Sequence, residues 1–326
     1  MRHAWLCLSL FFLFTGASHA EDARGWLLAL DLALAQPTGV DQPLALVSAP
    51  RSERISLEHD ADLAWGAGLG YAFGPNHGRI QVSYWTFEND DAENFTQTGT
   101  VYPQLFGYGY YGSFYLCNQS SGGCDSTLPV SFAGTFNIKA STWDLDYADT
   151  LEITEHFGLK WLAGLRTASY EQEQSFEGFD GYYTYLQDKS LDVDAIGIRV
   201  GAAGDFHLSQ HFSLRAGMAY SSLIGTSEGK ASQRIVELGL SESRSGKDDN
   251  FSGSILDLEL RGVWSAGPVD ISLGLTNSQW NGFPRDQVPA VGFQGVGESS
   301  VDDSLSFSSF EVGLLWRFGR QRFTSP

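Results

Sequence analysis

The sequence has few charged residues, few basic residues and almost no cysteine. Charged residues make up 18% of its 326 residues, and 20 Lys and Arg stand against 39 Asp and Glu, which gives a net charge of −19. The low basic content excludes a typical nucleic-acid-binding protein, because contacts with phosphates require a basic surface. The 10 prolines and 37 glycines, without a strict glycine period, exclude collagen, and 42% hydrophobic residues exclude a disordered chain.

The sequence also lacks a hydrophobic run long enough for a membrane-spanning helix. An apolar run at 4–14 follows the basic Arg2 and precedes the small residues Ser18 and Ala20. It is shorter than the roughly 20 residues that such a helix requires. The pattern is that of a secretory signal peptide. We therefore predict that residues 1–20 are removed on export and that residues 21–326 form a single domain.

The three cysteines fit an exported protein. Cys7 lies within the signal peptide, and the other two, Cys117 and Cys124, are separated by a short polar stretch. No further His or Cys lies beside them to complete a metal site. In an oxidising compartment, a disulfide that closes this loop is the natural interpretation. No metal site and no cofactor are predicted.

Alternation with a period of two residues, the pattern of β-strands, recurs along the chain. In residues 25–35, Trp26 and four leucines alternate with Asp31 and small residues. Similar segments lie at 62–73, 79–85, 143–147, 160–166, 196–201, 212–220, 256–261, 269–275 and 310–318. The sequence thus predicts about ten strands. Twelve is the alternative, if the first connection and residues 101–116 hold further strands.

The connections between these segments differ in length in a regular way. Short turns alternate with long connections at about 36–60, 89–138, 172–191, 224–252 and 279–303. This asymmetry is typical of outer-membrane barrels, which have short periplasmic turns and long extracellular loops. The predicted fold is therefore all-β: a transmembrane antiparallel up-and-down β-barrel. A secreted soluble β-sandwich is the rival, but it has no reason to sort its loops by length.

The composition of the two strand faces favours the membrane barrel. One face is apolar, with aromatic residues near the strand ends, as at lipid interfaces. The other mixes small and charged residues, which suits a narrow lumen with internal ion pairs. These charges would either stabilise the barrel or tune ion passage. The predicted pore-lining residues are Asp31, Asp62, Arg79, Asp144, Asp146, Lys160, Arg166, Asp194, Arg199, Arg215, Asp257, Glu259, Arg261, Glu311 and Arg317.

Much of the remaining negative charge falls in the long connections. Solvated loops are the simplest interpretation, and the resulting field would attract cations to the mouth of the barrel. The expected partners are outer-membrane lipid and lipopolysaccharide, with divalent cations at the acidic loops as a further option. No nucleic-acid partner is expected, and the oligomeric state is open. The acidic loop residues include Glu88, Asp90, Asp91, Glu93, Glu171, Glu173, Glu177, Asp180, Asp248 and Asp249.

Several of these segments resemble a known family. Residues 25–37, 65–73, 143–147, 162–168 and 196–201 are similar, in this order, to the Legionella-type major outer membrane protein family. The resemblance covers most of the mature chain. It implies a pore-forming barrel in the outer membrane of a Gram-negative cell, and it assigns no catalytic residue.

The predicted function is a narrow, mildly cation-preferring pore for ions or small solutes. The alternative is a non-conducting surface or adhesion protein that acts through its extracellular loops. An enzyme is not predicted, because the Asp-x-His sequence at Asp205 to His207 falls at a predicted periplasmic turn. An enzyme of the outer-membrane protease type would need its acidic residues and His at the extracellular rim.

Overall fold

A computed structural model gives the fold of the chain. It describes residues 24–39, 42–47, 53–57, 59–74, 77–99, 101–103, 126–154, 156–179, 183–283 and 304–319. The predicted signal peptide and the predicted Cys117–Cys124 disulfide lie outside these residues. No helix in the described part is long and apolar enough to cross a membrane. The strands are β1 (Gly25–Thr38), β2 (Gln42–Val47), β3 (Glu53–Leu57), β4 (Asp62–Ala72), β5 (Arg79–Gly99), β6 (Val101–Pro103), β7 (Ser126–Thr154), β8 (Phe157–Phe179), β9 (Thr184–His207), β10 (Phe212–Ile235), β11 (Leu240–Ala266), β12 (Val269–Asn281) and β13 (Leu305–Gly319).

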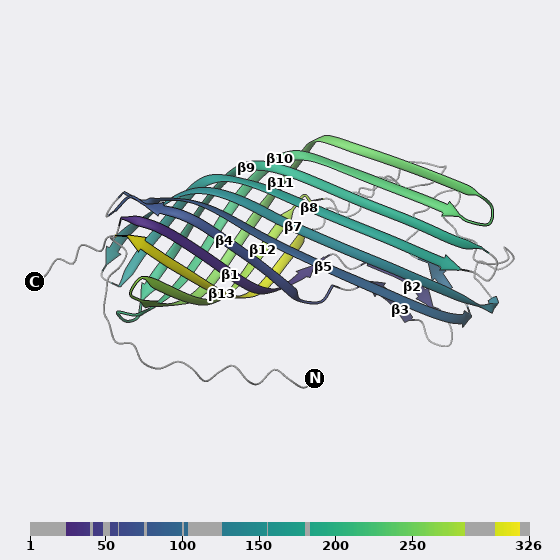
Figure 1. Cartoon of the computed structure of the whole chain (residues 1–326), viewed down its shortest axis with the longest axis horizontal. Helices are drawn as coiled ribbons and strands as arrows, with labels where there is room; N and C mark the ends of the chain where they lie inside the picture. Colours follow the sequence, from purple (N-terminus) through teal and green to yellow (C-terminus); the bar gives the residue numbers. More distant parts are fainter. Residues whose placement is uncertain are drawn as a thin grey trace, which may run out of the picture.

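Ten strands form a closed antiparallel barrel in the order β1-β13-β12-β11-β10-β9-β8-β7-β5-β4 (Figure 1). β1 closes it by pairing with β13 on one side, from Gly25 opposite Gly319, and with β4 on the other. The predicted ten-stranded barrel is therefore confirmed. The additional strands β2, β3 and β6 pair only with one another, in a separate three-stranded sheet. They add no strand to the barrel.

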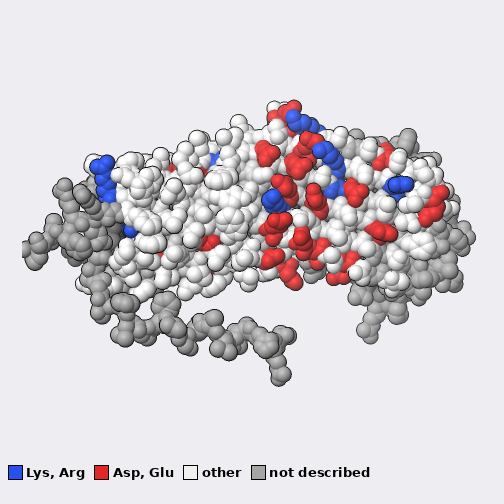
Figure 2. Space-filling model, in the orientation of Figure 1, with Lys and Arg blue, Asp and Glu red and all other residues white. Residues whose placement is uncertain are grey.

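The apolar face of the strands points outward, as predicted. Trp26, Leu32 and Ile198 are more than half exposed, whereas residues of opposite parity are covered. Figure 2 shows one half of the barrel as almost uncharged and the other as dotted with acidic groups. At one edge of this uncharged belt the rings of Tyr84 and Trp143 lie 4.6 Å apart. Such paired aromatic side chains match an interfacial girdle.

The predicted long connections are largely strand. β7 has 29 residues and β11 has 27, whereas a transmembrane strand needs about 9–11. The segments predicted as loops at 172–191 and 224–252 are thus mostly continuations of β8 to β11. The turn between β10 and β11 comprises only residues 236–239. These strands project as hairpins beyond the shorter β1, β4, β12 and β13, on the side opposite the short turns (Figure 1).

Part-way along the projecting strands, the outward-facing side chains change from apolar to charged. In β8, the outward-facing residues are Trp161 and Leu165 in the half near the short turns, but Glu171 and Glu173 in the projecting half. This change corrects one predicted lumen residue. Asp194 is exposed on the outer face of β9, because it shares parity with Ile196 and Ile198 and not with Arg199.

The apolar core lies inside the lumen, at the level where the outer surface becomes charged. All ten barrel strands contribute buried side chains to this layer, which we call the septum. Alanines on β1 and β4 leave room for Phe87 of β5 to approach Phe307 of β13, with ring centroids 5.4 Å apart. The septum consists of Ala33, Ala35, Ala64, Phe87, Phe136, Ile138, Ala140, Ala168, Tyr170, Leu191, Val193, Ala195, Leu223, Phe251, Ile255, Trp280, Phe283, Leu305 and Phe307; the same apolar cluster continues into the projecting hairpins through Phe176 and Tyr185.

Candidate functional site: a charged layer in the lumen

Inward-facing charged residues fill the part of the lumen between the septum and the short turns. Their side chains project inward because they occupy the strand positions that alternate with the exposed apolar residues. We call this set the ion layer. Its members are Asp31, Arg79, Asp144, Asp146, Lys160, Arg166, Arg199, Asp205, Arg215, Asp257, Glu259, Arg261, Asp270, Glu311 and Arg317.

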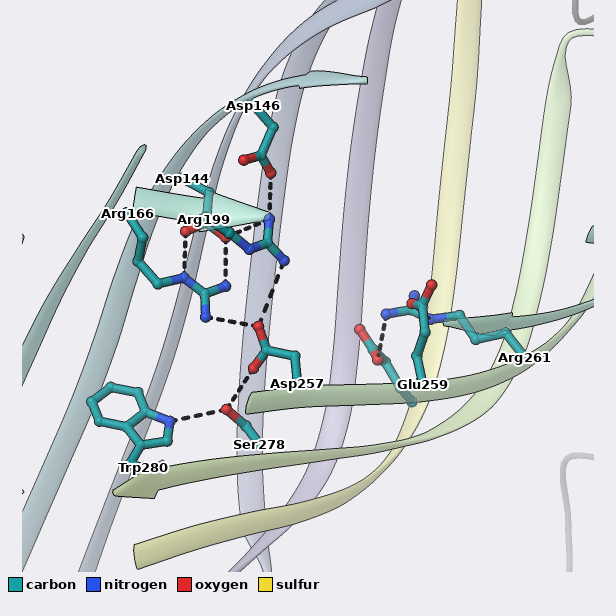
Figure 3. Close-up of polar contacts among 10 residues, drawn as sticks. Asp144, Asp146, Arg166, Arg199, Asp257, Glu259, Arg261, Ser278 and Trp280 are labelled. Carbon is teal, nitrogen blue, oxygen red and sulfur yellow. Dashed lines mark hydrogen bonds and ion pairs between the residues drawn. The ribbon is translucent and has the colours of Figure 1, made fainter. Parts of the chain in front are cut away.

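Arg166 is the centre of the most buried group in the ion layer. It is only 5% exposed and lies opposite Asp144 in the register of β8 with β7. Its guanidinium donates two bonds to the Asp144 carboxylate, Nε to Oδ1 at 2.6 Å and Nη2 to Oδ2 at 2.8 Å. A third bond, Nη1 to Asp257 Oδ2 at 2.7 Å, crosses the lumen to β11 (Figure 3). One guanidinium thus joins strands that are not neighbours in the barrel.

Arg199 connects the same carboxylates from the next strand. It pairs with Asp144 at 3.2 Å, with Asp257 at 3.6 Å, and also with Asp146. Two guanidinium groups therefore share three carboxylates, a network in which each buried charge has opposite charges beside it. Such pairing is what makes burial of the charges tolerable.

The network continues from the ion layer into the septum. Ser278 donates to Asp257 Oδ1 at 2.7 Å, and Trp280 Nε1 donates to Ser278 Oγ at 2.9 Å (Figure 3). Trp280 is fully buried. A polar chain therefore runs from the carboxylates to one of the largest side chains of the apolar layer.

A second group surrounds Arg261 of β11. It pairs with Glu259 on its own strand at 3.0 Å, with Glu311 of β13 at 2.9 Å, and with Asp31 of β1 at 3.3 Å. Three carboxylates thus contact one guanidinium, so this side of the lumen carries an excess of negative charge. The group lies beside the Arg166 network, and together they span the lumen.

Two smaller groups lie nearer the short turns. Asp205 of β9 lies 2.7 Å from Lys160 and 2.7 Å from Arg215, which are on the two flanking strands. Arg317 of β13 donates to Asp270 of β12 through Nη1 at 2.8 Å, and Nη2 also bonds this carboxylate. These pairs extend the charged lining toward the end of the barrel that carries the short turns.

A cavity of about 400 Å³ lies within the lumen. Its walls include Asp31, Arg166 and other members of the ion layer, and it reaches Trp85, Trp280 and Phe307 at the septum. The volume falls in the range of small-molecule sites, about 300–1,000 Å³. The lumen is therefore partly hollow between the apolar layer and the short turns.

Thirteen of the fifteen predicted pore-lining residues lie in the ion layer; Asp62 and Asp194 do not. Asp62 is exposed at the outer end of β4, where it accepts a bond from Asn89 at 3.4 Å. Prediction from sequence missed Asp205 and Asp270, although their parity along the strand could have identified them. It also missed the septum. Within the described ranges, no group of three or more His, Cys, Asp or Glu side chains is arranged to hold a metal ion.

Three solved structures are similar to this chain at low sequence identity. Escherichia coli outer membrane protease OmpT is 11% identical with a TM-score of 0.45, over 90% of this chain and 97% of that one. The Pseudomonas putida toluene transporter TodX is 11% identical with a TM-score of 0.36, over 91% of each chain. Pseudomonas aeruginosa OprG is 12% identical with a TM-score of 0.30, over 92% and 98%.

A search of curated proteins gave no match. In contrast, the family model described as Legionella pneumophila major outer membrane protein precursor matches residues 25–251, which is more than half of the sequence. This range contains β1, β4, β5, β7, β8, β9 and β10 of the closed barrel and extends into β11. The chain therefore belongs to the Legionella major outer membrane protein family and is an outer-membrane β-barrel.

Proposed function

We propose that the protein is a narrow pore for ions or small solutes that slightly prefers cations. The observation that carries this proposal is the ion layer, which lines a hollow part of the lumen with charged groups. Among its members, carboxylates exceed basic groups by one, and the excess is concentrated around Arg261. A lining with surplus negative charge lowers the energy of a cation more than that of an anion. Nothing in this function requires catalysis, and we propose no enzymatic activity.

The test is current through single proteins in a planar bilayer under a salt gradient. The mature protein should give discrete steps with a reversal potential that favours cations. The double variant with Asp144→Asn and Asp146→Asn should shift this potential toward anions, because it removes two lumen carboxylates. Asp194→Asn is the matched control, since it removes a carboxylate from the outer face of the barrel. A conducting protein whose selectivity changes with neither variant would refute the role of these residues.

The alternative function is a non-conducting surface protein that acts through its extracellular part. The observation that favours it is the septum, whose large side chains are buried against one another inside the lumen. Projecting strands β7 to β11 would then provide the functional surface. Absence of current from protein shown to be folded and inserted would support this alternative.

We also propose that lipopolysaccharide contacts the outer face just beyond the apolar belt. Glu88, Lys139, Glu171, Asp192 and Glu228 form a row across β5 to β10 at this level, each opposite the next in register. Divalent cations could bridge these carboxylates to lipid phosphates. Native gel mobility of a lipopolysaccharide complex, with and without EDTA, tests this contact.

The route of export stays a prediction from the sequence. We propose that residues 1–20 are cleaved as the protein passes to the periplasm. Mass spectrometry of protein isolated from outer membranes should give a chain that begins at Glu21.

A further inference from the structure

The septum contains a chain of aromatic contacts that crosses the lumen. The ring of Phe307 lies 5.6 Å from Trp85 of β5 and 5.7 Å from Trp280 of β12. Trp280 in turn lies 4.8 Å from Phe283, which lies 5.1 Å from Phe251 of β11. This chain passes over β1 and β4, whose inward residues at this level are alanines. Large rings from non-adjacent strands can therefore meet.

The opposite wall completes the layer with branched and aromatic side chains. Ile138, Tyr170, Leu191, Leu223 and Ile255, from five successive strands of the barrel, are each at most 1% exposed. Water therefore reaches almost none of the surface of these five side chains. The septum lies between the cavity in the ion layer and the interior of the projecting hairpins.

A hydrated ion would meet two different barriers along this lumen. The ion layer offers charged groups that replace part of the hydration shell. The septum offers mostly apolar surface, with few buried polar groups such as Gln172 and Asn89, and a narrow, largely apolar constriction excludes water and therefore ions. Of the two layers, the septum imposes the larger desolvation cost.

We propose that the septum is the barrier that sets how much current the lumen passes, whereas the ion layer sets which sign of ion is preferred. This inference rests on the proposed pore function. Its structural basis is that the two properties reside in separate layers, contributed by different residues of the same strands. For example, β13 supplies Phe307 to the septum and Glu311 to the ion layer. The two properties should therefore change independently.

Phe307→Ser is the direct test, because it places a small polar group at the middle of the aromatic chain. Measured in planar bilayers, this variant should raise the mean conductance at least about tenfold, which corresponds to about 1.4 kcal/mol of barrier. Its reversal potential should equal that of the unmodified protein. Phe87→Ala, which opens the septum from β5, is the second variant and serves if Phe307→Ser fails to insert.

Phe310→Ser is the matched control. Phe310 lies three residues along the same strand but faces lipid, with 53% of its surface exposed, so its replacement should leave conductance unchanged. If the unmodified protein conducts as well as both septum variants, the septum does not limit the current, although the protein is still a pore. Absence of current from the unmodified protein and from both inserted variants would overturn the pore itself, and the barrier with it. A conductance gain accompanied by a changed ion preference would overturn the separation of the two properties.

Discussion

Trp280 and Ser278 lie two positions apart on β12, and the indole Nε1 of Trp280 donates to the hydroxyl of Ser278 at 2.9 Å. Side chains two positions apart in a strand point to the same side, here the lumen. The hydroxyl in turn donates a hydrogen bond to Oδ1 of Asp257 at 2.7 Å. A single serine thus satisfies a buried indole of the septum and a partly buried carboxylate of the ion layer.

Replacement of this serine should destabilise the barrel. Ser278→Ala leaves the Trp280 N–H without its acceptor, and an unsatisfied buried donor costs about 1–3 kcal/mol. The free energy of unfolding, from urea titration of the protein refolded in lipid, gives the effect. Trp280→Phe provides the control background. There, Ser278→Ala should cost less, and an equal cost in both backgrounds would show that the indole bond contributes nothing.

Loss of a guanidinium from the ion layer should have a larger effect. Arg166→Met leaves Asp144, which is 7% exposed, without its two shortest bonds. Removal of one partner from a buried pair typically costs about 3–5 kcal/mol. The expected readout is a lower urea midpoint and loss of the heat-modifiable folded band on gels.

The exposed pair of Lys139 and Glu171 supplies the comparison for this experiment. These groups lie 3.9 Å apart, with 43% and 49% of their side chains exposed. Lys139→Met should change the unfolding free energy by less than about 1 kcal/mol, because solvent screens an exposed pair. Equal effects at Arg166 and Lys139 would contradict the buried character of the ion layer.

The sequence allowed prediction of the barrel because its membrane-facing segments alternate with a constant sign. Residues 25–35 place Trp26 and four of the five leucines outside and Asp31 inside, and the structure agrees. The rule that apolar strand residues face outward did not hold in the parts of the strands that project beyond the lipid. In residues 168–178, Tyr170 and Phe176 point inward while Glu171 and Glu173 point outward, so the charged half of the pattern resembled a loop. In these parts of the strands, charged and apolar residues still alternate with a period of two, but with the charged residues outward. This pattern could have predicted both the strand extensions and the septum.

The partners within the ion layer could not be predicted from the sequence. Alternation gives the face on which Arg166 lies, but its contact with Asp257 depends on the register and closure of four strands, β8 to β11. The misplacement of Asp194 has a different cause. Its parity indicated the outer face, and only the assumption that charges in strands face the lumen put it inside.

The edge of the bilayer can be located along the outer face of β9. Ile198 is 63% exposed within the apolar belt. Asp192, six residues earlier in the strand and nearer the projecting end, is exposed on the same face. Arginine on the lipid face costs about 2–4 kcal/mol near the midplane and about 0–1 kcal/mol at the interface. Ile198→Arg should therefore destabilise the barrel strongly in urea titrations, whereas Asp192→Arg should have little effect. A similar cost at both positions would mean that lipid extends to Asp192.

One contact between the tips of two projecting hairpins should be lost in acid. Glu237, in the turn between β10 and β11, accepts bonds from the backbone N–H and the hydroxyl of Thr184, at 2.7 and 2.8 Å. The backbone bond lowers the pKa of the Glu237 carboxyl below its usual value. A lowered pKa means that the contact is fully present above the ordinary pKa of a glutamate, and is lost as pH falls through the value in the folded protein.

Hydrogen exchange at the Thr184 amide measures this contact directly. Relative to the intrinsic exchange rate at each pH, protection should be constant near neutrality and should fall in the acid range, below the usual pKa of glutamate. Glu237→Gln keeps an acceptor oxygen but removes the charge, so protection should be weaker and independent of pH. The amide of Asp188, within the β9 ladder, is the reference, because its environment contains no contact with Glu237. An acid-dependent loss that persists in Glu237→Gln would assign the titration to another group at the hairpin tip.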